Sequence, residues 1–566
     1  MILRKHLGIS IAAAGLIAMA IFFRLGYVGA SDVITDEASL GFRAIGLIDF
    51  DATIHQPSPW EWANILSSWM RLSMHDHPPL FFIIQHFSLK ILGENTIALR
   101  LPSAIFGILS AYLIYSITKK LFDEKTAMVA GALSSANVYL IWVSRIGLQE
   151  STLIFFFLLS IYFFLKSFSD ERFFILCGIC VGLSWLTKYT AFILAPIFLT
   201  YFIIFDRQYF RNKFFWAGVA LALAIFSPVL LYNYRLYLAF GHFDFQFSYV
   251  FGQNVAQWQI QPGKEEFKNI LDKFFSIFIN LKNGLSPAFA GLLLATMVYF
   301  FHNIITNRNK NKIFLLLALI FLFLEYIVIG PSQRFLSAII PFFIIIISCS
   351  IIDVYNSIQK FARIAMWKYA FTLLLFLFFV YEAIFSYQTN ITMQPKHYYS
   401  KDIASHYSYS GYQNLDQWLT DEIQNKKPRF SFDLSYIFLK DISIKTNEKY
   451  NRGNFKDEGI LFVYDENMNE QSSLWIMHRL MIYHNWPVLA SKQYYNAIQK
   501  NGDDYYKKLG FEKIYLIKKD PETLGKKFSL EGKNIDDLIS YLNISGSEPY
   551  ILKNSQGKKS FSIYSL

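Results

Sequence analysis

Two neighbouring carboxylates, Asp36 and Glu37, come directly after the first long apolar stretch of this 566-residue chain. That stretch, residues 7–28, is long enough to cross a bilayer, which takes ~20 apolar residues. The two acids are therefore predicted at a membrane boundary. A carboxylate there can act as a general base toward a hydroxyl or an amine. The structural alternative is that one of them caps the N-terminus of a helix, where acids are favoured.

A second set of residues could bind the phosphate of a lipid. These residues are basic and are predicted on the same side of the membrane as Asp36, at the ends of apolar segments. They are His77, Arg100, Arg145, Lys188 and Arg334. Arginine offers a planar fork to phosphate oxygens and lysine a point charge. A base, phosphate-binding cations and a membrane boundary together suggest group transfer from a lipid phosphate.

Four of these basic residues also have a structural alternative. Arg100, Lys188 and Arg334 could extend their side chains to lipid head groups. Arg145 could form an ion pair with Glu150 between two spans.

Composition identifies the elements that must carry these groups. Hydrophobic residues make up 54% of the chain and charged residues 17%, whereas a soluble domain has roughly a quarter charged residues. The net charge of +11 falls in short clusters between apolar runs, which is typical of orientation in a bilayer and not of a nucleic-acid surface. We expect a mainly α, polytopic transmembrane bundle of about eleven spans. The candidate spans are residues 7–28, 97–118, 127–143, 151–167, 173–187, 189–205, 214–232, 285–304, 313–330, 335–353 and 367–387.

The charge distribution also predicts the topology. With these spans, the basic clusters at 119–120, 207–213, 308–312 and 360–368 lie on the side of Arg4 and Lys5, which predicts a cytoplasmic N-terminus. A cleaved signal peptide, the alternative reading of the first 30 residues, gives the same orientation. Residues 29–96 form the first outer loop, with interfacial helices expected at 58–75 and 79–92, and 233–284 form a long outer loop.

Two domains are expected. Residues 1–387 form the transmembrane catalytic domain, and residues 388–566, which are polar with short apolar runs, form a soluble extracytoplasmic α/β domain. The three cysteines lie in apolar segments, so no structural disulfide is expected, and Cys177 and Cys180 are interpreted as packing residues. His75, Asp76 and His77 lack a defined further ligand. A divalent metal is therefore not supported, and no cofactor is expected.

Several short motifs resemble the membrane glycosyltransferases of the GT-C class. The closest resemblance is to the family 39-like group of protein O-mannosyltransferases and lipid A aminoarabinose transferases, over roughly residues 1–350. The motifs are Thr35-Asp36-Glu37, His77-Pro78-Pro79-Leu80, Ala98-Leu99-Arg100-Leu101-Pro102-Ser103-Ala104 with Phe106-Gly107, Ser144-Arg145 with Glu150, Leu186-Thr187-Lys188, and Gln333-Arg334-Phe335 with Pro341. Their order and spacing carry the resemblance.

The resemblance implies transfer of a sugar from a polyprenyl-phosphate-linked donor to an acceptor on the outer face of the membrane. Asp36 matches the catalytic base of the family, with Glu37 as its neighbour, and a single displacement would invert the anomeric centre. The implied donor- and phosphate-binding residues are Asp76, His77, Arg100, Arg145, Glu150, Lys188 and Arg334. His77 stands where aminoarabinose transferases have lysine. The chain has no Trp-Trp-Asp stretch, which argues against the oligosaccharyltransferase branch of the class.

Two other classes of function remain open at this point. A transporter or flippase of lipid-linked sugars would have paired repeats and ionisable residues near the middle of the bilayer. A scaffold that presents residues 388–566 would tolerate the loss of Asp36. The sequence leaves open which sugar is moved and whether the acceptor is a protein, a lipid or a glycan.

Overall fold

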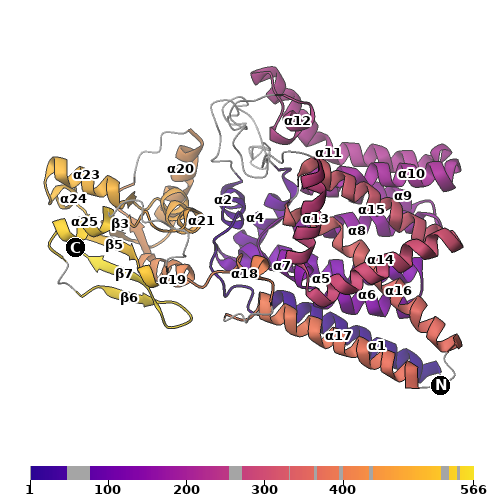
Figure 1. Ribbon diagram of the computed structural model, residues 1–566. Helices are drawn as coiled ribbons and strands as arrows, with labels where there is room; N and C mark the ends of the chain where they lie inside the picture. Colours follow the sequence, from indigo (N-terminus) through magenta and orange to yellow (C-terminus); the bar gives the residue numbers. More distant parts are fainter. Residues whose placement is uncertain are drawn as a thin grey trace.

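The structure is a computed structural model that describes residues 2–47, 77–253, 270–330, 332–361, 366–393, 399–431, 437–523, 534–544 and 548–566. Figure 1 shows a large helical body, followed by a smaller C-terminal part built around a sheet. Asp76 and the predicted interfacial helix 58–75 lie outside the described residues. Residues 254–269 of the predicted loop 233–284 also lie outside them.

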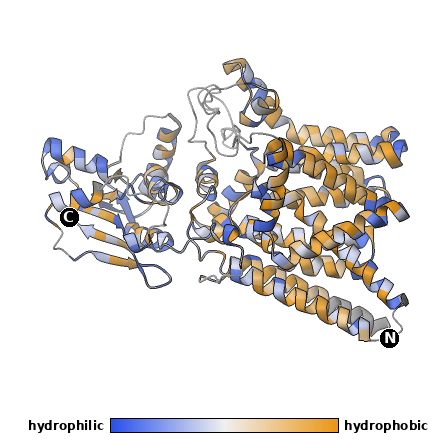
Figure 2. Cartoon of the chain, in the orientation of Figure 1, coloured by the Kyte–Doolittle hydropathy of each residue, from blue (hydrophilic) through white to orange (hydrophobic). Residues whose placement is uncertain are grey.

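The helical body is apolar along most of its length (Figure 2). Within the described ranges, seven helices are long and apolar enough to cross a membrane. They are α5 (Thr96–Leu121), α8 (Glu150–Ser167), α11 (Lys213–Phe240), α14 (Pro287–Asn307), α15 (Lys310–Ile329), α16 (Ile340–Phe361) and α17 (Met366–Asn390). The chain is thus a multi-pass membrane protein.

Other predicted spans correspond to bent or shorter helices. Helices α6 (Glu124–Ala136) and α7 (Val138–Arg145) meet at 53° and together add at most one span. Three other predicted spans are shorter apolar segments: the Ala12–Leu25 part of α1 (Ile2–Leu25), α9 (Phe173–Thr187), and η2 (Tyr189–Ile193) with α10 (Leu194–Phe205). The segment 79–92, which is predicted as an interfacial helix and not as a span, contains α4 (Leu80–Leu92), a further short apolar helix. The total of about eleven spans stays a prediction.

Asparagine side chains define two helix starts that matter for the site. The Asn95 side chain accepts a hydrogen bond from the Ala98 amide, which places Arg100 in the first turns of α5. The Asn137 side chain accepts from the Leu140 amide at 3.0 Å, so α7 begins at the same residue that ends α6. This cap accounts for the bend between the two helices.

Shorter elements connect these helices or follow them. They are α2 (Glu37–Gly46), α12 (Phe245–Val250), α13 (Ile270–Gly284), η5 (Gln333–Ala338) and α18 (Lys401–Ala404), whereas η3 (Arg207–Arg211) links α10 and α11. Figure 1 places α2 and α4 at the end of the helical body that faces the C-terminal part.

The C-terminal part contains a five-stranded sheet in the order β4-β3-β5-β7-β6. Strand β3 (Ile460–Tyr464) runs parallel to β4 (Val488–Ala490) and β5 (Lys513–Lys519), and β7 (Lys559–Ser565) is antiparallel to β5 and β6 (Tyr550–Lys553). Residues 460–463 are all buried, as expected for a parallel strand covered on both faces. A parallel pair, β1 (Lys426–Pro428) and β2 (Lys456–Glu458), forms a second sheet.

Helices surround these strands. They are α19 (Tyr412–Ile423), α20 (Ile437–Arg452), α21 (Glu470–Ser473), η6 (Leu474–His478), α22 (Arg479–His484), α23 (Ser491–Asn501), α24 (Tyr505–Lys508), η7 (Pro521–Thr523) and α25 (Asn534–Tyr541).

One apolar core joins the C-terminal part to the start of the chain. Val33 and Ala38, on either side of Asp36, share this core with Leu415 and Trp475 of the C-terminal part. The segment that carries Asp36 is therefore packed between two parts of the molecule that are far apart in the sequence.

Candidate functional site

Asp36 and Glu37 are adjacent in sequence but lie in different surroundings. Asp36 occupies the N-cap position of α2, and its side chain is 58% exposed. Its Oδ2 atom lies 2.8 Å from Nη1 of Arg334. The Glu37 side chain is 2% exposed and points into the protein. Only Asp36 of the two is accessible to a substrate.

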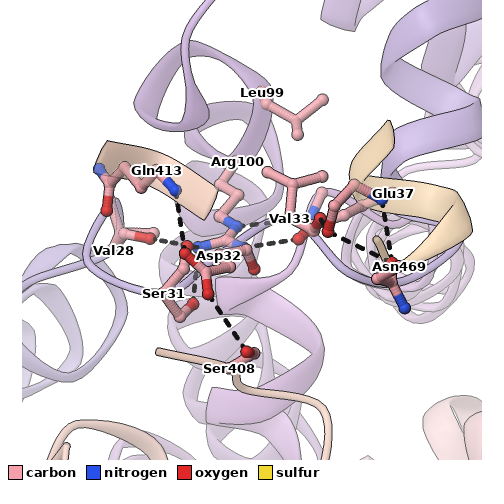
Figure 3. Close-up of polar contacts among 12 residues, drawn as sticks. Val28, Ser31, Asp32, Val33, Glu37, Leu99, Arg100, Ser408, Gln413 and Asn469 are labelled. Atoms are coloured by element: carbon pink, nitrogen blue, oxygen red, sulfur yellow. Dashed lines mark hydrogen bonds and ion pairs between the residues drawn. The ribbon is translucent and has the colours of Figure 1, made fainter. Parts of the chain in front are cut away.

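Glu37 and Arg100 form a buried, two-point ion pair. Nε of Arg100 donates to Glu37 Oε2 at 2.9 Å, and Nη2 donates to Oε1 at 2.5 Å. Nη1 donates to the carbonyls of Val28 and Ser31, and Nη2 also donates to the carbonyl of Asp32 (Figure 3). Each guanidinium nitrogen therefore already has an acceptor within the protein.

Glu37 reaches a third element through the backbone of Gly147. The Gly147 amide donates to Glu37 Oε2 at 2.7 Å. A Cβ added at Gly147 would lie 3.1 Å from the Leu99 carbonyl oxygen and 3.2 Å from Glu37 Oε2, so the close approach suits glycine. Gly147 lies in the junction between α7 and α8. The carboxylate thus ties α2 and α5 to this junction.

Glu150, at the start of α8, forms a second buried ion pair. Its Oε1 atom lies 2.9 Å from Nζ of Lys188, at the end of α9, and the two side chains are 2% and 11% exposed. The Lys188 ammonium also lies 4.9 Å from the ring centroid of Phe335. Phe335 directly follows Arg334 in η5, so this contact places the Lys188 ammonium near Arg334.

Arg334 connects Asp36 to the ion pair between Glu150 and Lys188. Burial alone lowers the pKa of Arg334, but the nearby carboxylates of Glu150 and Asp36 raise it above its ordinary value, so the guanidinium stays charged. The Tyr139 hydroxyl contacts the Gln333 carbonyl at 2.8 Å and the Arg334 carbonyl at 2.9 Å, which holds η5 against α7. The structure therefore brings together Asp36, Arg334, Glu150 and Lys188, which we call the four-charge cluster.

Arg145 has a different position from the one its charge suggested. Its guanidinium donates to the carbonyls of Phe23, Gly26 and Tyr27 at 2.7–3.2 Å. These carbonyls belong to the C-terminal end of α1 and the turn after it, where unpaired carbonyls and the helix dipole favour a cation. Within the described residues Arg145 forms no ion pair with Glu150, whose carboxylate bonds to Lys188 instead.

Two residues near the cluster were not predicted from the sequence. His406, just after α18, is half-buried, and its ring lies 4.7 Å from that of Trp142. Burial and the charge of Arg334 lower the pKa of His406, while Asp36 opposes the shift. Glu325, on α15, is close enough to Lys188 for their charges to interact. His406 comes from the polar C-terminal part and Glu325 from within an apolar run, and neither is part of a recognisable motif.

The remaining predicted residues give less information. His77 is half-buried just before α4. Among the described residues, no group of three or more histidine, cysteine or acidic side chains is arranged to hold a metal ion. Cys177, Cys180 and Cys349 are free and buried.

Comparisons with known proteins give a consistent picture. Residues 76–232 match the dolichyl-phosphate-mannose-protein mannosyltransferase family. The chain is 26% identical over 219 residues to YkcB of Bacillus subtilis, whose name assigns it provisionally to the mannosyltransferases. That alignment covers 34% of this chain and 30% of YkcB, so the chain matches about a third of the length of this relative.

Two solved structures share the fold over most of the chain. ArnT of Cupriavidus metallidurans superposes with a TM-score of 0.51 at 13% identity, and the match covers 99% of this chain and 98% of ArnT. The oligosaccharyltransferase of Archaeoglobus fulgidus superposes with a TM-score of 0.53 at 12% identity and covers 90% and 69%. At such low identity these likenesses concern the fold.

Proposed function

The chain has the fold of the GT-C class of membrane glycosyltransferases, and on that premise we propose that it transfers a sugar from a polyprenyl-phosphate-linked donor to an acceptor on the outer face of the membrane. The observation that carries the proposal is the four-charge cluster. It offers one accessible carboxylate beside an accessible arginine, backed by a buried lysine. A base and phosphate-binding cations in contact are what a displacement at a sugar phosphate needs.

Asp36 is the proposed general base. It is the most exposed carboxylate of the site, whereas Glu37 and Glu150 are buried and committed to Arg100 and Lys188. A base must reach the acceptor's proton to within hydrogen-bond distance, which a buried and paired carboxylate cannot do. Glu37 is accordingly proposed as a structural residue that holds the start of α2.

Arg334 and Lys188 are the proposed phosphate ligands. The Arg334 side chain is 35% exposed, so its planar fork is available to a ligand. Lys188 supplies a second positive charge from a buried position, and Glu150 and Phe335 hold its ammonium in place. Arg100 and Arg145 are proposed to act structurally, because their guanidinium groups bind backbone carbonyls and, for Arg100, Glu37.

Donor binding would prepare the base. A donor phosphate competes with Asp36 for Arg334, and a carboxylate released from an ion pair is a stronger base. The acceptor oxygen or nitrogen then attacks the anomeric carbon as Asp36 takes its proton. The bond from that carbon to the phosphate oxygen breaks, and Arg334 and Lys188 stabilise the departing charge. One such displacement inverts the anomeric centre.

The relatives support the choice of donor. A second structure of ArnT, at a TM-score of 0.51, is described as bound to undecaprenyl phosphate. For this chain the lipid carrier, the cell-membrane location, the cytoplasmic N-terminus and the outer placement of residues 388–566 are part of the proposal. The identity of the acceptor is treated as open.

Replacing Asp36 tests the base directly. Asp36→Asn keeps the shape of the side chain but removes its basicity, so we expect transfer to fall by roughly 10²–10⁴-fold. The measurement is release of polyprenyl phosphate from polyprenyl-phosphate-linked mannose, and from other lipid-linked sugars, in membranes that contain the protein. Asp170→Asn is a matched control, because Asp170 also forms a 2.9 Å ion pair with an arginine, Arg172, beyond the other end of α8. Undiminished transfer by Asp36→Asn would exclude Asp36 as the base.

Replacing Arg334 tests the phosphate site. Arg334→Gln removes the charge and the fork, and we expect kcat/KM for the lipid-linked donor to fall by roughly 10–100-fold. Arg334→Lys keeps the charge without the fork and should recover part of that loss. Steady-state kinetics with varied donor concentration measures both variants. An unchanged kcat/KM in Arg334→Gln would mean that Arg334 does not bind the donor phosphate.

A further inference from the structure

Asp32 is a buried carboxylate in the segment between α1 and α2, four residues before Asp36. It is 3% exposed, and its charge is solvated by the C-terminal part of the chain. The amides of Ser410 and Gln413 donate to its two oxygens at 2.6 and 3.0 Å, and the Ser408 hydroxyl donates at 3.2 Å. The Asp32 amide donates in return to the Ser408 carbonyl at 2.8 Å. Figure 3 shows Asp32 directed at Ser408 and Gln413.

The same residue is held from the membrane side. Arg100 donates to the Asp32 carbonyl at 3.1 Å, and it also binds Ser31 and Glu37. Asp32 therefore joins Arg100 of α5 to the segment 408–413. Asp36 therefore lies between two residues with fixed positions, Asp32 four residues before it and Glu37 directly after it.

The choice of a carboxylate at this position needs a reason. Burial raises the pKa of Asp32, and the Gln413 and Ser410 amides, the Ser408 hydroxyl and the charge of Lys519 oppose that shift. The Lys519 ammonium is itself buried and donates to the Ser410 carbonyl at 2.8 Å. Apolar packing of Val33 and Ala38 on Leu415 and Trp475 already joins the two parts. Hydrogen bonds to the Asp32 carboxylate are directional, so they fix the position and orientation of its segment relative to residues 408–413. Apolar contact alone does not do this.

We infer that Asp32 is a positioning residue for transfer, through which the C-terminal part of the chain sets the place of Asp36 relative to Arg334. This inference rests on the proposed function, because it assigns a role in a reaction at Asp36. It also gives residues 408–413 a part in the reaction without contact to the substrate. A small displacement of a reacting group is enough to lower turnover strongly.

Asp32→Asn is the first test. An asparagine has one acceptor oxygen, so its amide group must face the Ser410 or the Gln413 amide, donor against donor. We expect turnover with polyprenyl-phosphate-linked mannose to fall by roughly 10–100-fold. KM for that donor should change by less than about threefold, because Arg334 and Lys188 are untouched.

Tyr483→Phe is the matched control. The Tyr483 hydroxyl donates to the Phe42 carbonyl at 2.6 Å and so joins the same two parts, but on α2 beyond Asp36. Its loss should leave turnover within about threefold of wild type. Equal losses in the two variants, or a proportional rise of KM in Asp32→Asn, would mean that Asp32 only holds the two parts together.

A second readout does not depend on turnover. Hydrogen exchange should become faster at the Ala38 and Leu40 amides, which bond to Thr35 and Asp36, in Asp32→Asn but not in Tyr483→Phe. Unchanged exchange at these amides would overturn the positioning role even if no donor is turned over. Faster exchange without any wild-type transfer would instead count against the proposed function alone.

Ser408→Ala covers the case in which Asp32→Asn does not fold. It removes one of the three donors to the carboxylate and leaves the two amides in place. We expect a smaller fall in turnover, roughly two- to fivefold, again with KM unchanged. Full turnover together with unchanged exchange in this variant would contradict the inference.

Discussion

The ion pair between Asp36 and Arg334 joins two groups that the proposed reaction uses separately. At 2.8 Å the carboxylate and the guanidinium satisfy each other, and both remain partly open to solvent. Exposed pairs of this kind contribute little to stability, about 0–1 kcal/mol, so a phosphate can displace the carboxylate at small cost. Arg334 can thus exchange Asp36 for a donor phosphate when the donor binds.

The ion pair between Glu37 and Arg100 has the opposite character. Both side chains are 2% exposed, and the arginine also binds the carbonyls of Val28, Ser31 and Asp32. Removing one partner of a buried pair leaves an uncompensated charge. We expect Glu37→Gln to lower the free energy of unfolding by about 3–5 kcal/mol, measured as a lower midpoint of thermal denaturation in detergent.

The control for Glu37→Gln is an exposed pair in the C-terminal part. Lys445 and Asp441 lie 2.8 Å apart with side chains 64% and 37% exposed. Asp441→Asn should change the free energy of unfolding by less than about 1 kcal/mol. If both variants denature like the wild type, the role of Glu37 in fixing α2 is wrong.

Among the helices, two glycines allow a close crossing of α9 and α11. A Cβ added at Gly178 of α9 would lie 2.0 Å from the Gly218 carbonyl oxygen of α11, and one at Gly218 would lie 2.3 Å from the Phe174 carbonyl oxygen. Small residues allow such contact between backbones in a membrane, where apolar side chains gain little from leaving lipid. This crossing fixes α9, and with it Lys188 at the residue after that helix.

Gly178→Val should therefore disturb the site from a distance. We expect α9 and α11 to separate, with a loss of roughly 1–3 kcal/mol in the free energy of unfolding and a lower transfer rate through displacement of Lys188. Thermal denaturation and donor turnover measure the two effects. Gly291→Val is the control, because a Cβ on that α14 glycine would meet no atom within 4 Å. Equal behaviour of the two variants would contradict the argument.

At the scale of the whole molecule, the C-terminal part is held to the membrane body by charge as well as by apolar packing. Glu94, between α4 and α5, lies 3.0 Å from His484, and the Glu94 carbonyl accepts a hydrogen bond from Arg479 at 2.5 Å. The cavity beside these groups measures about 790 Å³ and is lined by residues of α2, α4, α19, α20, η6 and α22. Ile45 and Gly46, at the C-terminal end of α2, also line this cavity, so the contact lies at the opposite end of α2 from Asp36.

Acid should weaken this contact. Burial alone raises the pKa of Glu94, but His484 and Arg479 outweigh it and hold the pKa at about 2, below the ordinary 4.5. The unfolded state therefore binds more protons between these values. The stabilisation, on the order of 3 kcal/mol, is complete above about pH 4.5 and is lost as the pH falls toward 2.

Thermal denaturation between pH 6 and pH 3 measures the effect. Glu94→Gln should be less stable than the wild type at pH 6 and should lose less stability on acidification. Asp421→Asn, at an exposed position of α19, should follow the wild type throughout. If Glu94→Gln and the wild type lose the same stability between these pH values, Glu94 is not the titrating group.

Features that depend on local pattern could be predicted from the sequence. Apolar runs of membrane length predicted the multi-pass helical body, and the order of short motifs indicated the GT-C class, which the fold and the comparisons confirm. The adjacency of Asp36 and Glu37 to the first apolar run also marked a boundary position. Helix-forming runs and motif spacing are properties of neighbouring residues, so they can be read along the chain.

The partners of the charged residues, in contrast, depend on how the folded chain packs. Arg100, Arg145, Lys188 and Arg334 are alike in sequence as cations at the ends of apolar segments. In the folded protein Arg100 and Arg145 bind buried backbone carbonyls, whereas Arg334 binds Asp36. Asp32 and His406 gained their surroundings from residues up to hundreds of positions away. Whether a charge is buried and which partner it meets depends on long-range contacts, which no local pattern contains.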